Sequence, residues 1–108
     1  MNGNAVIKLQ SSMEQLEMED LKLATKIFRA LNHPLRLSIV RLIEEHGRLS
    51  VTQIYFKLRI EQSVASQHLA ILRECDVLTS LRDGKNIYYA INPARLNAIL
   101  RSIDTLKD

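Results

Sequence analysis

The hydrophobic pattern of the chain changes from helical to alternating near Leu78, and this change most constrains the possible folds. In residues 62–75 the apolar side chains recur with the period of an α-helix, and Ala65, Leu69 and Leu72 share one side. From residue 78 onward, β-forming residues dominate two short runs, separated by Asp83-Gly84, a pair typical of a tight turn. The pattern predicts a helix followed directly by a two-stranded β-hairpin over residues 78–91.

Helical spacing also predicts helices over residues 9–31, 34–46, 51–58 and 93–106. Pro34 suits a first helical position and cannot continue the helix before it. Gly47 suits a helix C-terminus, and Ser50 is a candidate N-cap for the helix that follows. The predicted fold class is therefore mainly α (α+β), with five helices and a hairpin in the order α-α-α-α-β-β-α. We expect one domain over residues 1–108.

The first and last helices carry more apolar surface than a domain of this size usually needs. Their stripes comprise Leu9, Met13, Leu16, Leu23, Ala24, Ile27 and Leu31 in the first helix, and Leu96, Ile99, Leu100, Ile103 and Leu106 in the last. The surplus predicts a homodimer in which residues 9–31 and 93–106 pair across a two-fold axis. The alternative is that both stripes close the core of a monomer.

The composition excludes several classes of protein. Hydrophobic residues make up 46% of the 108 residues, which indicates a folded core and not a disordered chain. The apolar runs are too short to cross a membrane and no signal peptide is recognisable, so we expect a cytoplasmic location and no membrane partner. Cys75 is the single cysteine, which excludes an internal disulfide, and we expect it to be a small buried apolar residue.

The net charge of +3 is unevenly distributed. Residues 1–20 hold one basic and four acidic residues, so residues 21–108 hold 14 of the 15 basic and 8 of the 12 acidic residues, a net of +6. This basic part of the chain is compatible with a polyanionic partner.

Residues 51–75 are predicted to form two helices joined by the three-residue break at residues 59–61, and the hairpin behind them has a basic tip. The second helix of such a unit can enter the major groove of DNA, where base edges present donors and acceptors. Its outward face carries Ser63 and Gln67, which offer both, and Ala70, which is small enough to permit a close approach. The order therefore predicts a winged helix-turn-helix domain that binds double-stranded DNA.

Three segments resemble the signatures of the ArsR/SmtB family of bacterial winged helix-turn-helix repressors. They are LNHPLRLSIVRLI (31–43), SVASQHLAILRECDVL (63–78) and RDGKNIYYAI (82–91). The resemblance covers residues 23–91 and implies a homodimeric transcriptional repressor that binds an inverted-repeat operator and releases it when an inducer binds. The alternative is a winged-helix protein-interaction module without sequence-specific DNA binding, a reading that the aromatic pair Tyr55 and Phe56 favours.

The resemblance assigns DNA-binding positions to the recognition helix and to the wing. They are Gln62, Ser63, Ser66, Gln67 and His68 in the helix, and Arg82 and Lys85 in the wing. Gln67 is the best candidate for reading a base edge, because its amide can pair with adenine through two hydrogen bonds. The alternatives are a helix-start role for Ser63, a packing role for His68, and ordinary solvated charges for the two wing residues. Arg36 is expected to be structural.

The chain departs from the family at its metal sites. The segment RLSVTQI (48–54) lacks the cysteine pair of soft-metal sensors, and residues 93–108 lack the histidine that zinc and nickel sensors use. His33, His46 and His68 fall on three different predicted elements. We therefore expect no regulatory metal and no cofactor, and the inducer is unknown. No nucleophile with a supporting base and no glycine-rich phosphate loop is recognisable, so an enzyme is not expected.

Two further departures concern the turns and the first helix of the helix-turn-helix. Arg59 and Asp76 stand where the family often has glycine, and a left-handed backbone costs these residues roughly 1 kcal/mol more than it costs glycine. Tyr55 stands where the family usually has alanine. We expect its ring to fill a gap beside the recognition helix, although an exposed Tyr55-Phe56 pair would suit a ligand or partner site.

Overall fold

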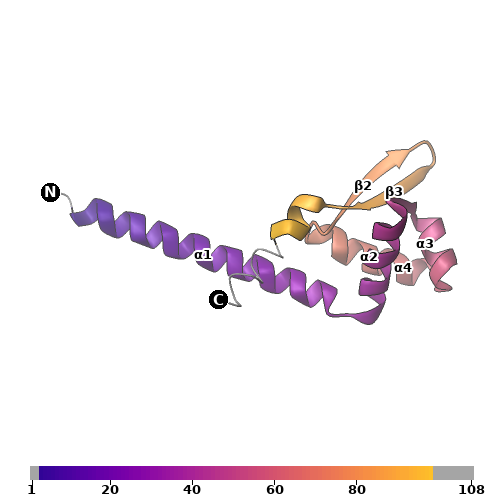
Figure 1. Ribbon diagram of the computed structural model, residues 1–108, viewed down its shortest axis with the longest axis horizontal. Helices are drawn as coiled ribbons and strands as arrows, with labels where there is room; N and C mark the ends of the chain where they lie inside the picture. The colour runs from indigo at the N-terminus through magenta and orange to yellow at the C-terminus, as the bar shows by residue number, and fades with distance from the viewer. Residues whose placement is uncertain (1–2, 99–108) are drawn as a thin grey trace.

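The computed structural model describes residues 3–98, apart from the side chains of residues 13 and 15–17 (Figure 1). The elements are α1 (Gly3–Leu31), α2 (Pro34–His46), β1 (Arg48–Ser50), α3 (Val51–Leu58), α4 (Gln62–Glu74), β2 (Leu78–Asp83) and β3 (Asn86–Ile91), and residues 93–98 are again helical. The mainly α winged helix-turn-helix fold predicted from the sequence is confirmed.

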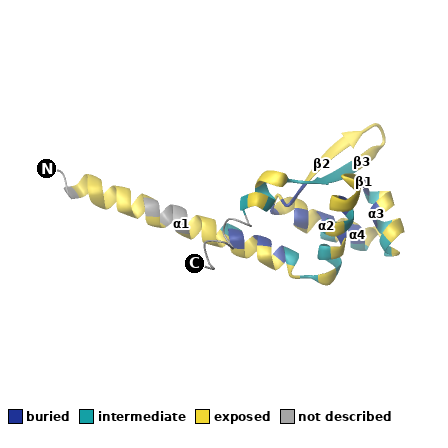
Figure 2. Ribbon diagram, in the orientation of Figure 1, coloured by how far each residue is buried: buried dark blue, intermediate teal, exposed yellow. Residues whose placement is uncertain are grey.

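Helix α1 is the longest element, and its N-terminal half projects away from the rest of the fold (Figure 1). Among the described residues, the C-terminal part of α1 packs against the other helices and the sheet, and Ala24, Ile27 and Ala30 are buried there. Figure 2 shows the contrast between this buried end and the exposed projecting part. The helix begins at Gly3, six residues before the position that the apolar stripe predicted.

The boundaries of α2 and α3 agree with the positions predicted for Pro34, Gly47 and Ser50, and the structure adds His33 as a cap. His33 is the N-cap of α2, where its Nδ1 accepts a hydrogen bond from the Leu35 N–H at 3.2 Å, and Gly47 ends α2 with a φ of 83°. Ser50 and Gln53 form a reciprocal capping box at the start of α3, with hydrogen bonds of 3.2 and 2.9 Å. Pro34, Gly47 and Ser50 therefore act as the sequence predicted.

The sheet has three strands, and the prediction of a hairpin alone was incomplete. Strand β1 pairs antiparallel with β3, so the order is β1-β3-β2, with Arg48 opposite Ala90 and Ser50 opposite Tyr88. A three-residue strand is too short to show the alternation by which strands are recognised. The turn is also one residue later than predicted, because Asp83 still pairs with Asn86.

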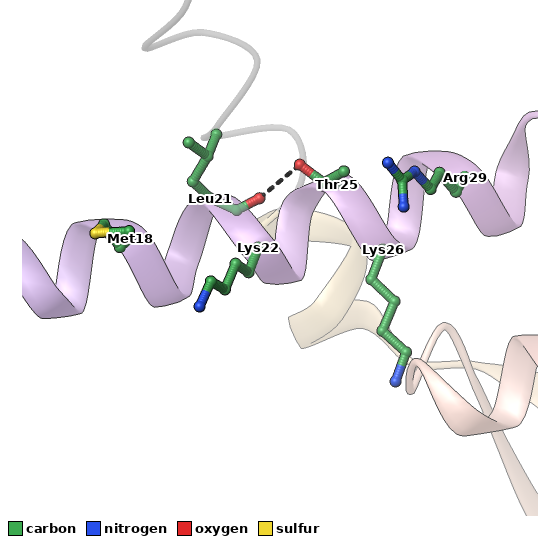
Figure 3. A pocket seen from close by; sticks show the side chains of 6 residues that line it. All are labelled: Met18, Leu21, Lys22, Thr25, Lys26 and Arg29. Atoms are coloured by element: carbon green, nitrogen blue, oxygen red, sulfur yellow. Dashed lines mark hydrogen bonds between the residues drawn. The ribbon is translucent and has the colours of Figure 1, made fainter.

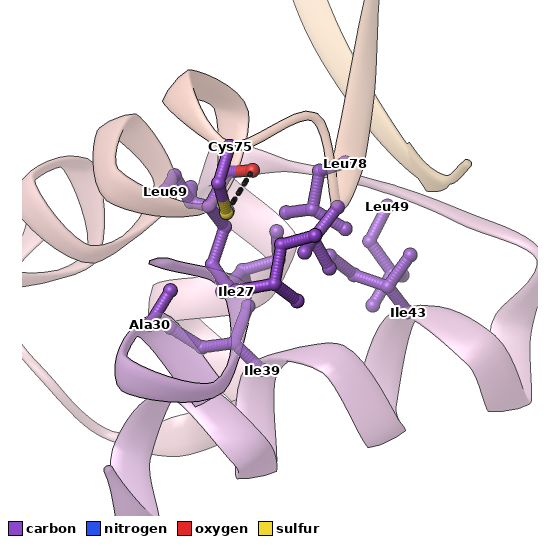
Figure 4. Packing of buried hydrophobic residues seen from close by; sticks show 11 residues of the cluster. Ile27, Ala30, Ile39, Ile43, Leu49, Leu69, Cys75 and Leu78 are labelled. Carbon is purple, nitrogen blue, oxygen red and sulfur yellow. Dashed lines mark hydrogen bonds between the residues drawn. The ribbon is translucent and has the colours of Figure 1, made fainter. Parts of the chain in front are cut away.

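The core lies between α2, α3, α4 and the sheet, and the C-terminal part of α1 closes it (Figure 4). Its fully buried side chains include Ile39, Ile43, Ile54, Leu69, Leu72 and Leu78. The predicted inner side of α4 is confirmed, since Ala65, Leu69 and Leu72 are all buried. Cys75 is buried as expected, 3% exposed, with its thiol 3.5 Å from the Leu72 carbonyl oxygen.

Two residues that are not glycine adopt the left-handed backbone conformation, at the positions where the sequence departs from the family. Arg59 ends α3 with φ 56° and ψ 44°, and Asp76 follows α4 with φ 60°. The Asp76 carboxylate also pairs with Arg95 at 3.2 Å.

Within residues 3–98, no helix is long and apolar enough to cross a membrane.

Candidate nucleic-acid interface

Helices α3 and α4 and the turn at residues 59–61 form the helix-turn-helix. Helix α4 begins after Glu61, which is its N-cap but makes no side-chain hydrogen bond to the first turn. The N–H groups at this end of α4 are therefore not satisfied by a side-chain cap. Unpaired N–H groups and the positive end of the helix dipole together attract phosphate.

The outward face of α4 brings together four of the predicted site residues. Gln62, Ser63, Ser66 and Gln67 are all exposed, as is Ala70 one turn further along. The N-terminal half of this face is polar but uncharged, and it offers hydroxyl and amide groups that both donate and accept hydrogen bonds. Ser63 lies inside the first turn, after the N-cap, so a capping role does not explain its position.

His68 differs from these four residues because it is half-buried and faces the other helices. Its Nδ1 lies 3.3 Å from Nη1 of Arg36, and its ring centroid lies 4.8 Å from that of His33. Burial lowers the pKa of His68 below its usual value of 6.5, and the nearby His33 and Arg36 lower this pKa further. The imidazole is therefore neutral at pH 7, and its Nδ1 can accept a hydrogen bond from Arg36.

The wing carries Arg82 and Lys85 at its tip, where both are exposed. Arg82 Nε lies 3.4 Å from the Gly84 carbonyl oxygen, and Lys85 is itself a turn residue. Gly84 takes the first turn position with a φ of 64°, a conformation that a two-residue hairpin loop requires. Figure 1 shows that this tip projects beyond the helical body.

Arg48 also contributes to the wing, and the sequence reasoning missed it. From β1, its guanidinium lies 4.3 Å from the centre of the Tyr88 ring and 3.6 Å from the Asp83 carboxylate. These contacts tie β1 to both strands of the hairpin. Only recognition of β1 as a strand could have revealed this role, and the sequence carries no such signal.

The two aromatic residues of α3 have different environments. Tyr55 is half-buried, whereas Phe56 is 79% exposed. The half-burial of Tyr55 agrees in part with the expectation that its ring fills a gap beside the recognition helix. Phe56 is an exposed apolar side chain on the first helix of the helix-turn-helix.

The histidines are less scattered than the sequence suggested. His33 and His68 meet, whereas His46 lies at the end of α2 with its Nδ1 3.0 Å from the Leu42 carbonyl oxygen. The Arg36 guanidinium beside the first two would repel a metal cation. Among the residues that the structure describes, no three His, Cys, Asp or Glu side chains are grouped so that they could hold a metal ion.

Helix α1 has a second apolar face, which is exposed. At 100° per residue, Ile7, Met18, Leu21 and Phe28 share a side of α1 largely opposite to buried Ile27, and their exposed fractions are 61, 59, 60 and 37%. Figure 3 shows part of this surface, a shallow hollow of about 540 Å³ that Met18, Leu21 and Thr25 line together with basic side chains. The Thr25 hydroxyl is satisfied by the Leu21 carbonyl oxygen at 2.8 Å.

Comparison with known proteins identifies one family of regulators. Residues 33–80 match the family described as bacterial regulatory protein, arsR family. The chain is 35% identical over 95 residues to the transcriptional repressor PagR of Bacillus anthracis. The aligned region spans 88% of this chain and 92% of PagR. The PagR crystal structure aligns with a TM-score of 0.62 at 37% identity, covering 80% of this chain and 97% of that one. An ArsR-like regulator from Rhodococcus sp. RHA1 shares the fold, with a TM-score of 0.74, 22% identity and 81% of each chain covered.

Proposed function

The chain belongs to the arsR family of bacterial regulatory proteins and is a DNA-binding transcriptional regulator, not an enzyme; from this premise we propose that it is a homodimeric repressor that reads an inverted-repeat operator. In this proposal, each protomer inserts α4 into the major groove of one half-site, and its β2–β3 hairpin contacts the flanking backbone or minor groove. The two-fold symmetry of the dimer matches the symmetry of the operator.

The observation that carries the proposal is the exposed polar face at the N-terminal half of α4, with two exposed cations on the neighbouring hairpin. We assign base reading to Gln67 and contacts to bases or phosphates to Gln62, Ser63 and Ser66. We assign phosphate contacts to Arg82 and Lys85. Half-buried His68, whose ring is engaged by Arg36, is better suited to supporting α4 than to touching DNA.

The exposed apolar face of α1 supports a homodimer. A long helix that projects from the body with exposed Ile7, Met18 and Leu21 gains stability when another apolar surface covers it. The stripe from which this contact was predicted lies partly in the core of the protomer, where Ala24 and Ile27 are buried, as the monomer alternative expects. The dimer contact that we propose on α1 is therefore its exposed face with Ile7, Met18 and Leu21. The other half of the predicted contact, residues 93–106, lies mostly outside the described residues, and only its beginning is seen, where Leu96 packs against the core.

We expect the inducer of this regulator to be something other than a soft metal, because residues 48–54 carry no thiol. Cys75 does not suggest a redox signal, since its thiol is buried and is the single one of the chain.

Selection of random duplexes by the purified full chain, at about 50 mM and about 200 mM salt, tests DNA reading. We expect enrichment of one inverted repeat, with affinity that falls as salt rises. Salt-sensitive binding without an enriched sequence would contradict sequence reading. Absence of binding at both salt concentrations would contradict the proposal as a whole and direct attention to a protein partner at Phe56.

Sedimentation of the wild-type chain and of Leu21→Glu tests the dimer contact. A charge in the centre of the exposed α1 face should shift the chain from dimer to monomer at micromolar concentration, because an unpaired charge is costly to bury. Leu81→Glu is the matched control, since Leu81 is similarly exposed, at 63% against 60% for Leu21, but lies on the hairpin. A dimer that persists in Leu21→Glu would exclude this face of α1 as the contact.

A further inference from the structure

Arg36 connects three parts of the fold through one side chain. It lies in the first turn of α2 and is half-buried. Its Nε donates a hydrogen bond to the carbonyl oxygen of Ala30, and its Nη2 lies 3.5 Å from the carbonyl oxygen of Arg29, both in the last turn of α1. Its Nη1 lies 3.3 Å from Nδ1 of His68 on α4. All three guanidinium nitrogens are therefore engaged.

The α1 end of this connection has a clear physical basis. The last carbonyl groups of a helix have no partner within the helix, and the negative end of the helix dipole attracts a cation. The planar guanidinium of Arg36 can hydrogen-bond both of these terminal carbonyl groups and still present a donor in another direction. A lysine ammonium has no such fork.

The α4 end of the connection lies directly behind the reading face. His68 follows Gln67 in sequence, but it points inward, where it meets Arg36 and His33. His33 is itself held at the N-terminus of α2 by the Leu35 N–H. The inward side chain of α4 next to the proposed base-reading residue is thus fixed to the end of α1 by directional contacts.

Apolar packing alone would hold these helices less strictly. Ile27 and Ala30 of α1 share the core with Leu69, Leu72 and Cys75 of α4. Such contacts are not directional, so they favour proximity but define a rotation of one helix against the other less sharply than hydrogen bonds do.

We propose that Arg36 is a positioning residue that sets the orientation of α4 relative to α1, and thereby the operator half-site spacing that the dimer accepts. The inference rests on the proposed function, in which α1 lies at the two-fold axis and α4 reads a half-site. If α1 fixes the axis, the angle between α1 and α4 determines the separation and rotation of the two reading helices. Each base pair added between half-sites turns one of them by about 34° relative to the other, so a fixed angle selects one spacing.

The test measures affinity for the inverted repeat enriched by the wild-type chain and for versions with the spacer shortened or lengthened by one or two base pairs. Arg36→Lys keeps the charge but cannot bridge both carbonyl groups and His68, and Arg36→Ala removes the connection altogether. Arg41→Ala is the matched control, because Arg41 is an exposed arginine on the same helix and takes part in neither of the ion pairs formed within residues 3–98.

The wild-type chain and Arg41→Ala should prefer one spacing by about tenfold, whereas both Arg36 variants should bind all spacings within about threefold of one another. A merely structural role would lower all affinities together and leave the preference intact. If Arg36→Ala fails to fold, Arg36→Lys decides the question. A spacing preference retained by Arg36→Lys would overturn the positioning role alone. A wild-type chain without any spacing preference would overturn the dimeric reader and the positioning role together.

Discussion

The rings of His33 and His68 lie with their centroids 4.8 Å apart and their planes tilted by 48°, which joins the start of α2 to the middle of α4. Arg36 completes this contact from the first turn of α2, with Nη1 3.3 Å from Nδ1 of His68. Every group that faces the His68 imidazole in these contacts is cationic or becomes cationic on protonation. The folded state therefore disfavours a proton on His68.

The stability of the fold should consequently depend on the protonation of His68. Its pKa is lowered in the folded state by burial and by His33 and Arg36, so the unfolded chain binds the proton more readily. The stabilisation from neutral His68 is complete above its unfolded pKa of about 6.5 and is lost as pH falls through the lower folded pKa. We expect the free energy of unfolding, measured by urea denaturation, to decrease from about pH 7.5 to about pH 5.5.

His68→Gln should flatten this part of the pH profile, because glutamine keeps an acceptor but does not titrate. His46→Gln, at the exposed end of α2, serves as the control and should leave the profile as it is. A profile of His68→Gln parallel to that of the wild type would show that the pH dependence comes from other groups.

The wing cations should contribute to DNA affinity independently of sequence. Lys85→Ala and Arg82→Ala should each weaken binding to specific and random duplexes alike and reduce the salt slope of log K by about 1, as expected for one lost phosphate contact. Arg41→Ala removes the same charge from the exposed surface of α2 and should leave the slope unchanged. Equal slopes for wild type and Lys85→Ala would mean that Lys85 is an ordinary solvated charge.

Arg59 is a site where glycine should stabilise the fold. Its φ of 56° and ψ of 44° are costly for a residue with a Cβ atom, and its side chain is exposed. Arg59→Gly should raise the free energy of unfolding by about 0.5–1 kcal/mol, as measured by thermal or urea denaturation.

The same substitution within a helix provides the comparison. Arg41→Gly, in the interior of α2, should lower the free energy of unfolding by about 1 kcal/mol. Asp76, also left-handed, should gain less from glycine because the change removes its ion pair with Arg95. Destabilisation by Arg59→Gly would indicate that the arginine side chain makes a contribution larger than its backbone strain.

Local signals account for the parts of the fold that were predictable. Pro34, Gly47 and Ser50 act within a few residues of themselves, and the inner side of α4 follows from the spacing of Ala65, Leu69 and Leu72. The exposed face of α4 is then the remaining side of the same helix. These features need no knowledge of tertiary contacts.

The unpredicted features depend on contacts between distant segments. Strand β1 exists because three residues pair with β3 some forty positions away, and Arg48 gains its role only through that pairing. The contact of Arg36 with His68 likewise spans 32 residues and carries no periodic signal. The exposed apolar face of α1, which includes Met18 and Leu21, was not predicted from the sequence. The apolar stripe through Leu23 and Ile27 was sufficient to predict the helix, so the apolar residues on its other side were not considered.

The most direct test of the central claim is a double-mutant cycle between Gln67 and the DNA. The enriched inverted repeat is changed base pair by base pair, symmetrically in both half-sites, and the affinities of the wild-type chain and of Gln67→Ala are measured for each duplex. We expect one A·T position in each half-site whose replacement costs the wild type about 1–3 kcal/mol and costs Gln67→Ala almost nothing. Equal costs for the two proteins at every position would contradict base reading by Gln67 and the orientation of α4 on which this account depends.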